Sequence, residues 1–129
     1  MTTARFIDHV GLHFDEQGPG RSRCAIDIEP HHLNTFGVVH GGVLFTLADT
    51  GMGAALVPML AEGESCATIE AKINYFRSTR AGRLECHSEV VHQGKSVAHI
   101  EARVTAAGQL VATAHGSFSI LQRAPARGG

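Results

Sequence analysis

The most apolar stretch of the chain is VLFTLADTGMGAALVPML, residues 43–60. Its length raises the question of a membrane span, which needs about 20 predominantly apolar residues. Asp49 near its middle, Pro58 and the absence of flanking Lys or Arg argue against a span. Because Pro58 disfavours helical geometry at Val57, we predict a helix over residues 43–57, about 22 Å long at ~1.5 Å per residue. A helix that is apolar on almost every side belongs inside a protein core.

The segments on both sides of this helix alternate apolar and polar residues, which is the period of a half-buried strand. Residues 21–29 precede the helix, and residues 11–16 are a candidate hairpin partner for them. Four more alternating segments follow the helix, joined by short turns, near residues 66–77, 84–90, 98–104 and 110–120. In the first of these, one face is predicted to hold Ala67, Ile69, Ala71, Ile73 and Tyr75, and the other Thr68, Glu70, Lys72 and Asn74.

A strand hairpin, one long helix and four further strands predict an α+β fold with one antiparallel sheet wrapped around one helix. The 129 residues have the length of one ordinary domain. We therefore expect a single domain over 1–129, with a core of about 11–121 and a flexible tail at 122–129. Aromatic residues make up only 5% of the chain, so small and aliphatic residues must fill the core closely.

Charge and cysteine usage exclude several classes of partner. Eleven Lys plus Arg against twelve Asp plus Glu leave a formal charge of −1, so we expect no nucleic-acid surface. Cys24, Cys66 and Cys86 are odd in number and lack metal-ligand spacing, which predicts buried, reduced thiols. The N-terminus has no apolar signal segment, so we expect a cytoplasmic protein that does not associate with a membrane.

The segment NTFGVVHGG, residues 34–42, leads into the predicted helix. A Gly-Gly pair at a helix start leaves backbone N–H groups without partners, and the helix dipole directs them at a developing negative charge. Gly41 and Gly42 can therefore form an oxyanion hole. The same pair is equally consistent with a tight turn and close packing.

Asp49 is a carboxylate in an apolar helix, and a lone buried carboxylate is costly unless it is paired or hydrogen-bonded. A hydroxyl of Thr46, Thr50 or Thr68 could hold it as a structural residue. Alternatively, Asp49 is a general base.

Asp49 lies seven residues beyond Gly42, about 10 Å along one helix. A carboxylate and an oxyanion hole that act on one carbonyl must converge to within ~3 to 4 Å. If both groups are catalytic, they must meet across a two-fold axis, which gives two equivalent sites per dimer.

Two other patterns carry less weight. His31, His32 and His40 do not match the spacing of a zinc site, and scattered histidines are more often surface or capping groups. Basic residues near the predicted strand ends could meet phosphates, although a solvated rim is the more common explanation. They are Arg77, Arg80, Arg83 and Lys95.

The pattern Asn34-x5-His40-Gly41-Gly42-x4-Leu47-Ala48-Asp49-Thr50, with the strand CATIEAKINYFR and the turn Gln93-Gly94-Lys95, resembles a known family. The family is the hotdog-fold acyl-CoA thioesterases of the phenylacetic acid degradation (PaaI) type, and the similarity covers roughly residues 21–120. It implies a hotdog fold in which two subunits join their sheets, commonly as a tetramer of two dimers. It also implies an active site across the dimer interface and no metal or redox cofactor.

Matched by position, the resemblance implies that the Gly41 N–H polarises the thioester carbonyl, with His40 and Asn34 shaping that end of the site. Asp49 of the partner subunit would act as general base on water or as nucleophile. Thr68 matches a strand position where such enzymes often keep a Ser or Thr to hold the water. We expect the following substrate-binding residues: Gly42, Phe36, Phe45, Met52, Arg77 and Lys95.

The chain departs from this family at two places. Gly51 stands where the family often has Ala, and Ser78-Thr79 replaces a common Pro. The first is expected to widen the acyl pocket and the second to alter contacts to the CoA arm.

The sequence thus predicts hydrolysis of a small, medium or aromatic acyl-CoA to the free acid and CoA. One alternative is a hotdog dehydratase or hydratase that acts on hydroxyacyl or enoyl thioesters, with His40 and Asp49 as its acid–base pair. Another alternative is a non-catalytic acyl-CoA-binding module.

Overall fold

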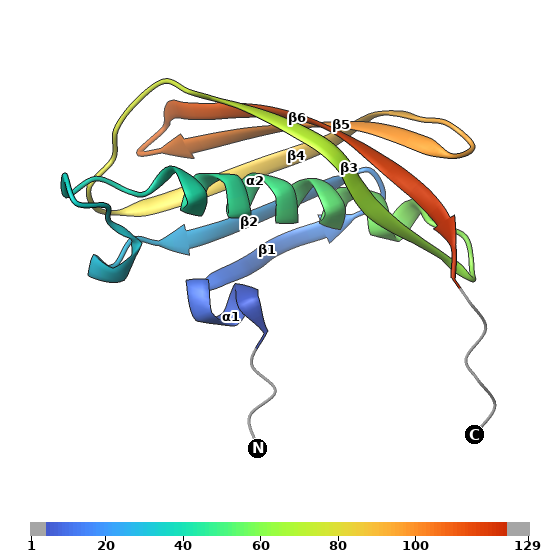
Figure 1. Cartoon of the computed structure of the whole chain (residues 1–129), viewed down its shortest axis with the longest axis horizontal. Coiled ribbons are helices and arrows are strands. Elements are labelled where there is room, and N and C mark those ends of the chain that lie inside the picture. The colour runs from blue at the N-terminus through green and yellow to red at the C-terminus, as the bar shows by residue number, and fades with distance from the viewer. Residues whose placement is uncertain (1–4, 124–129) are drawn as a thin grey trace, which may run out of the picture.

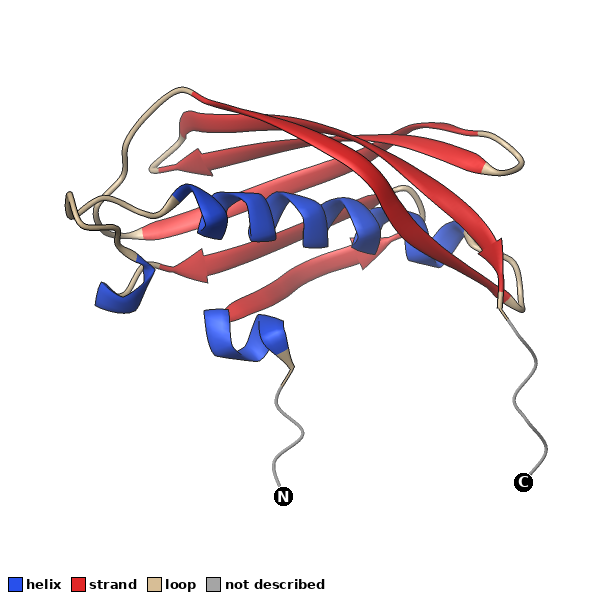
Figure 2. Ribbon diagram, in the orientation of Figure 1, coloured by secondary structure: helices blue, strands red, loops and turns tan. Residues whose placement is uncertain are grey.

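The computed structural model describes residues 5–123. Its six-stranded antiparallel sheet, in the order β1-β2-β4-β5-β6-β3, curves around the long helix α2 (Figure 1). The strands are β1 (Leu12–Gly18), β2 (Arg21–Asp27), β3 (Glu64–Tyr75), β4 (Arg83–Gln93), β5 (Val97–Ala106) and β6 (Gln109–Gln122). The helices are α1 (Phe6–Val10), α2 (Gly41–Leu56) and two short 3₁₀ turns, η1 (Pro30–His32) and η2 (Val57–Met59). The predicted α+β arrangement, one antiparallel sheet around one helix, is confirmed (Figure 2).

The predicted element boundaries differ from the observed ones by a few residues. Helix α2 begins at Gly41, two residues before the predicted start, because His40 caps it. It ends at Leu56, and Pro58 lies in the short 3₁₀ turn that follows. Helix α1 and η1 are too short to leave a periodic signal in the sequence. Gln122 belongs to β6 rather than to a tail, and residues 124–129 lie outside the described residues.

The core lies between α2 and the concave face of the sheet. Apolar side chains of α2 are buried there, at ~1.5 to 3 kcal/mol for each large one. The helix contributes Leu44, Leu47, Ala48, Met52, Ala55 and Leu56, and the strands contribute Ile26, Leu84, Ile100, Val104 and Phe118. Polar contacts fix the helix on the sheet, since Ser22 Oγ donates to the Gly51 carbonyl at 2.6 Å and Gly20 N–H to the Ala55 carbonyl at 3.0 Å.

Residues 5–123 leave one side of α2 uncovered. Gly42, Phe45 and Val57 are exposed on it, and Asp49 is half-buried. The segment Gly41–Met59 is long and apolar enough to cross a membrane by length and composition alone, with a mean hydropathy of 1.3, and 39% of that stretch is buried. Residues 5–123 therefore cover this helix on the sheet side, and on that side it lies in the core as predicted.

Strand β3 lies at one edge of the sheet and contains a β-bulge. Thr68 pairs with Phe118 and Glu70 with Ser117, so Ile69 is an extra residue in β3. An extra residue moves every later side chain to the opposite face of a strand.

The bulge corrects the predicted faces of β3. Ala71 and Ile73, after the bulge, pack against the core as predicted. Ala67 and Ile69 are exposed, and Cys66 packs against the core instead. The alternating pattern therefore predicted the wrong face for the residues before the bulge, because a single inserted residue does not show in a period-2 pattern.

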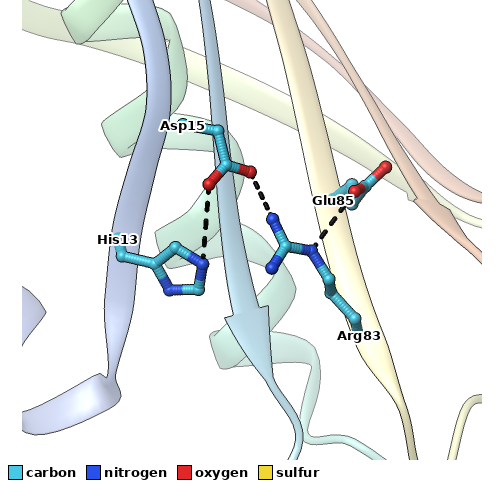
Figure 3. Close-up of polar contacts among 4 residues, drawn as sticks. All are labelled: His13, Asp15, Arg83 and Glu85. Atoms are coloured by element: carbon cyan, nitrogen blue, oxygen red, sulfur yellow. Dashed lines mark hydrogen bonds and ion pairs between the residues drawn. The ribbon is translucent and has the colours of Figure 1, made fainter.

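The outer face of the sheet is polar. Figure 3 shows Arg83 of β4 between Asp15 of β1 and Glu85 of its own strand. Because β2 lies between β1 and β4, the Asp15–Arg83 pair crosses over β2, where Ala25 is fully buried. Such half-exposed ion pairs contribute only ~0 to 1 kcal/mol each.

Candidate functional site

An open hollow of about 600 Å³ lies at the start of α2. Its lining includes four of the predicted site residues, Asn34, Phe36, His40 and Gly41, together with Leu33 and Thr35. The Asn34 side-chain oxygen accepts hydrogen bonds from the N–H groups of Phe36, at 2.9 Å, and Val38, at 3.2 Å. Asn34 thereby holds the loop that carries Phe36 beside the helix start.

His40 caps the helix. Its Nδ1 accepts a hydrogen bond from the Gly42 N–H at 2.8 Å, and its carbonyl accepts one from the Val43 N–H at 2.9 Å. Because Nδ1 accepts, the proton of the neutral ring lies on Nε2. The Gly41 N–H has no acceptor among residues 5–123. The helix start thus keeps one backbone donor, at Gly41, and the expectation that Gly42 also leaves a bare N–H is wrong.

Close packing explains why both positions are glycine. Neither Gly41 nor Gly42 has a positive φ. A Cβ at Gly42 would lie 2.9 Å from His40 Nδ1, and a Cβ at Gly41 would lie 3.2 Å from the hydroxyl of Tyr75. The alternatives weighed from the sequence are therefore compatible, since the packed glycines and the free Gly41 N–H occur together.

Asp49 lies on the uncovered side of α2 and has a partner on β3. The Thr68 hydroxyl donates to Asp49 Oδ1 at 2.8 Å. Of the three hydroxyls considered from the sequence, only Thr68 is hydrogen-bonded to this carboxylate, and Thr46 donates to the Gly42 carbonyl instead. The second carboxylate oxygen is available to accept a proton or a hydrogen bond from water.

The structure does not bring Asp49 to the helix start. Gly41 and Asp49 lie on one continuous helix, eight residues apart, which is about 12 Å along its axis. The Asp49–Thr68 pair and the Gly41 N–H therefore lie too far apart in one chain to act on the same carbonyl group.

The structure does not bring the predicted substrate-binding residues together in one place. Phe36 and Phe45 are exposed, near the hollow and on the uncovered side of α2. Met52 is fully buried, and its side chain packs against Gly116 of β6, so it does not reach the surface of the chain. Arg77 and Lys95 lie at opposite ends of the sheet, because Arg77 follows the end of β3 at Val111 and Lys95 lies in the turn before β5.

Arg77 shares its end of the sheet with two of the other basic residues. Arg77, Arg80 and Arg83 line a hollow of about 410 Å³ in the β3–β4 loop. Arg80 donates to the Gly37 carbonyl at 3.2 Å, and Arg83 pairs with Asp15. Two of the three guanidinium groups are thus engaged within the chain.

Gly51 faces the sheet and not the surface. A Cβ there would lie 2.8 Å from Ser88 Oγ and 3.2 to 3.3 Å from the sulfurs of Cys86 and Cys24. The expectation that Gly51 widens an acyl pocket is therefore wrong, because its missing side chain brings α2 close to β2 and β4.

The cysteines are free within the described chain. Cys24 and Cys86 are fully buried directly opposite each other, while Cys66 is half-buried. The hydrogen bond with Cys86 and burial raise the pKa of the Cys24 thiol, and burial raises the pKa of Cys66. Two of the three thiols are therefore buried as predicted.

The histidines that raised the metal alternative have other roles in the fold. His32 is buried, accepts from the Glu29 N–H at 2.9 Å and donates to the Val10 carbonyl at 2.6 Å, so both ring nitrogens are used. His31 packs against it, with 4.1 Å between ring centroids. Among residues 5–123 no three His, Cys, Asp or Glu side chains are grouped as a metal site.

Tyr75 also contacts the start of α2, and it was not among the site residues predicted from the sequence. Its hydroxyl donates to the Gly41 carbonyl at 3.0 Å. Burial raises the pKa of Tyr75, which keeps the hydroxyl protonated as a donor. The sequence offered one signal, because the alternation placed Tyr75 on the helix-facing side of its strand.

A six-stranded antiparallel sheet wrapped around one long helix is the hotdog fold, and the family and relatives that match the chain make it a thioester hydrolase of this fold. The chain belongs to the thioesterase superfamily, whose family model matches residues 36–113.

Three known proteins illustrate the similarity. Acyl-coenzyme A thioesterase 13 of Homo sapiens is 29% identical over 117 residues, which are 87% of this chain and 83% of the relative. A conserved protein of Pseudomonas aeruginosa is 33% identical, with a TM-score of 0.85 over 92% of this chain and 94% of that one. A mutant of the phenylacetic acid degradation protein PaaI from Thermus thermophilus is 28% identical, with a TM-score of 0.84 over 90% and 98%.

Proposed function

We propose that this protein hydrolyses the thioester of a small, medium or aromatic acyl-CoA to the free acid and CoA. The observation that carries the proposal is the Asp49–Thr68 pair, a carboxylate and a hydroxyl joined on the uncovered side of α2. A water bound beside this pair could donate one hydrogen to the second carboxylate oxygen of Asp49, its base, and the other to Thr68 Oγ1, which would position it. The name of the human relative, an acyl-coenzyme A thioesterase, supports CoA as the leaving group.

The complete site in this proposal forms between two copies of the chain. The separation of Gly41 and Asp49 on one helix requires a second copy if both act on one carbonyl. Strand β3 is an edge strand with Ile69 exposed, and the adjoining side of α2 exposes Phe45. Such an unpaired edge beside exposed apolar side chains supports a sheet-to-sheet contact between copies.

Each group has a role in the proposed reaction. In one route Asp49 removes a proton from water, and the water oxygen attacks the thioester carbonyl carbon. In the other route Asp49 itself attacks that carbon, and after CoA has left, water hydrolyses the acyl–Asp49 anhydride to release the free acid. The Gly41 N–H of the partner stabilises the oxyanion. The tetrahedral intermediate then collapses, the C–S bond breaks and CoA leaves as a thiolate that takes up a proton. No step needs a metal or a redox cofactor.

The other predicted site residues would form the surroundings of this centre. His40 and Asn34 set the shape of the Gly41 end. Phe36 and Phe45 offer apolar surface to the acyl group. Arg77, at the end of β3, would meet a phosphate of CoA.

The test is a panel of about a dozen acyl-CoAs with detection of the released thiol, comparing the wild-type chain with Asp49→Asn. We expect turnover of at least one substrate and a loss of ~100-fold or more in kcat for the variant, as for removal of a general base. Absence of thiol release for every acyl-CoA, or unchanged turnover in Asp49→Asn, would overturn the proposal. Hydration of enoyl-CoA without thiol release would favour the hydratase alternative, and saturable binding without either reaction would favour a binding module.

A further inference from the structure

The peptide unit between Gly41 and Gly42 is held at both ends by side chains. Its carbonyl, from Gly41, accepts the Tyr75 hydroxyl at 3.0 Å. Its N–H, from Gly42, donates to His40 Nδ1 at 2.8 Å. Tyr75 comes from the end of β3 and His40 from the residue before α2, so the unit is fixed from two separate elements.

This arrangement uses both glycines. The Tyr75 hydroxyl lies 3.2 Å from the position of a Cβ at Gly41, and His40 Nδ1 lies 2.9 Å from that at Gly42. Each missing Cβ therefore makes room for one of the two holding side chains. Two consecutive glycines are also the most mobile backbone that a helix start can have, so their orientation depends on outside contacts.

We propose that Tyr75 is a positioning residue for the thioesterase reaction: by holding the Gly41 carbonyl it fixes the helix start and so aims the Gly41 N–H at the substrate. The inference rests on the proposed function, in which that N–H stabilises the oxyanion. Oxyanion stabilisation needs a donor fixed before the reaction, because a donor that must reorient gives up part of its effect.

The role of Tyr75 is distinct from that of the Asp49–Thr68 pair. Tyr75 is half-exposed and contributes no atom to the proposed reacting centre. Its loss should therefore lower kcat and leave KM within about twofold, because the interaction it supports is stronger in the transition state than in the ground state.

The experiment compares Tyr75→Phe with a matched control, Gln17→Met. In the wild-type protein Gln17 Nε2 donates to the Ala54 carbonyl of α2 at 3.0 Å, near the other end of the helix. The control therefore also removes a side-chain donor from an α2 carbonyl, but far from Gly41. Two measurements are made on each protein: kcat and KM with the best acyl-CoA, and NMR hydrogen exchange of the Gly41 and Gly42 amides.

For Tyr75→Phe we expect a loss of about tenfold in kcat, an unchanged KM and faster exchange of the Gly42 amide. Gln17→Met should match the wild-type protein in kcat, in KM and in the exchange rate of the Gly42 amide. Unchanged exchange in Tyr75→Phe would overturn the holding role, and faster exchange with unchanged kcat would overturn its catalytic consequence. A wild-type chain that hydrolyses no acyl-CoA would overturn the proposed function instead, and the exchange rates would still report whether Tyr75 holds the helix start.

Discussion

The hydroxyl of Thr68 donates a hydrogen bond to the carboxylate of Asp49, and 2.8 Å separates Oγ1 from Oδ1. The two residues belong to different elements, β3 and α2, and the bulge at Ile69 brings them together. In a regular strand Thr68 would share the face of Glu70, away from the helix. The bulge is therefore the feature of the fold that assembles this pair.

Removal of the Thr68 hydroxyl should weaken the proposed water site. Thr68→Val keeps the shape of the side chain and deletes the donor to Asp49. We expect a loss of about tenfold in kcat for Thr68→Val and near wild-type kcat for Thr68→Ser, which keeps the hydroxyl. Steady-state thiol release measures both, and equal activity of the Val and Ser variants would contradict a role for the hydroxyl.

Gly41→Pro removes the backbone donor that we assign to the oxyanion. Gly41 is the first helical residue, where proline is well tolerated, and His40 has the extended backbone that precedes proline. We expect a loss of ~100 to 1,000-fold in kcat, as for removal of an oxyanion-hole donor. Gly41→Ala is the control, because it adds a Cβ beside Tyr75 and keeps the N–H. A smaller loss in the Pro variant than in the Ala variant would show that packing matters and the N–H does not.

Mixed dimers should reveal whether the site is shared between copies. Chains carrying Gly41→Pro and chains carrying Asp49→Asn are each expected to be inactive alone. Coexpressed in equal amounts, they should recover about a quarter of wild-type activity, because half of the dimers would be mixed and each would hold one complete site of two. If both groups served a site within a single chain, mixing would restore nothing.

Gly51 and Gly53 provide a matched pair for stability. A Cβ at Gly51 would lie 2.8 Å from Ser88 Oγ, whereas one at Gly53 would make an ordinary 3.7 Å contact with Phe118. We expect Gly51→Ala to lower the free energy of unfolding by ~1 to 3 kcal/mol through overpacking. Gly53→Ala should raise it by ~0.5 to 1 kcal/mol, because alanine favours the helix.

Denaturant unfolding at one protein concentration checks both glycine variants. Adding Ser88→Ala to Gly51→Ala removes the closest clashing atom and should recover part of the loss. Equal stabilities of the two single variants would contradict the packing argument.

Tyr75 should ionise above the ordinary tyrosine range. It is the one tyrosine of the chain, and tryptophan is absent, so ultraviolet phenolate absorbance reports this residue alone. Burial raises the pKa of Tyr75, so the folded state favours the neutral hydroxyl. Its contribution to stability is therefore present below the ordinary pKa of ~10 and is lost as pH rises through the folded-state pKa. A titration midpoint in the folded protein at or below that of the unfolded chain would contradict the burial argument.

Much of the fold could be predicted because its elements carry strong local signals. The long apolar run marked α2, and Pro58 marked its end to within two residues. Clean alternation marked the later strands, with Ile100 and Val104 on the buried face as expected. Helix α1 is a single short turn, too short to produce a periodic pattern in the sequence.

The candidate site was predictable in its residue types and less so in its contacts. Asp49 and Gly41 stand out from the sequence because a carboxylate in an apolar helix and a glycine pair at a helix start need an explanation. The partners of the helix start are less visible, since His40 engages Gly42 through its ring and Tyr75 engages Gly41 from a strand 34 residues away. The sequence around Gly51 likewise did not predict that this residue faces Cys24 of β2 and Cys86 of β4.

The sequence by itself determined the architecture, one helix inside one antiparallel sheet, because hydrophobic period and turn chemistry are local properties of the chain. It also determined that Gly41 and Asp49 lie too far apart on one helix to share a carbonyl, because the rise per residue is fixed. Only the tertiary structure decided that Thr68 reaches Asp49 and that Tyr75 holds Gly41. Those contacts depend on a one-residue bulge and on the seating of the helix against the sheet, and both arise from packing between distant segments.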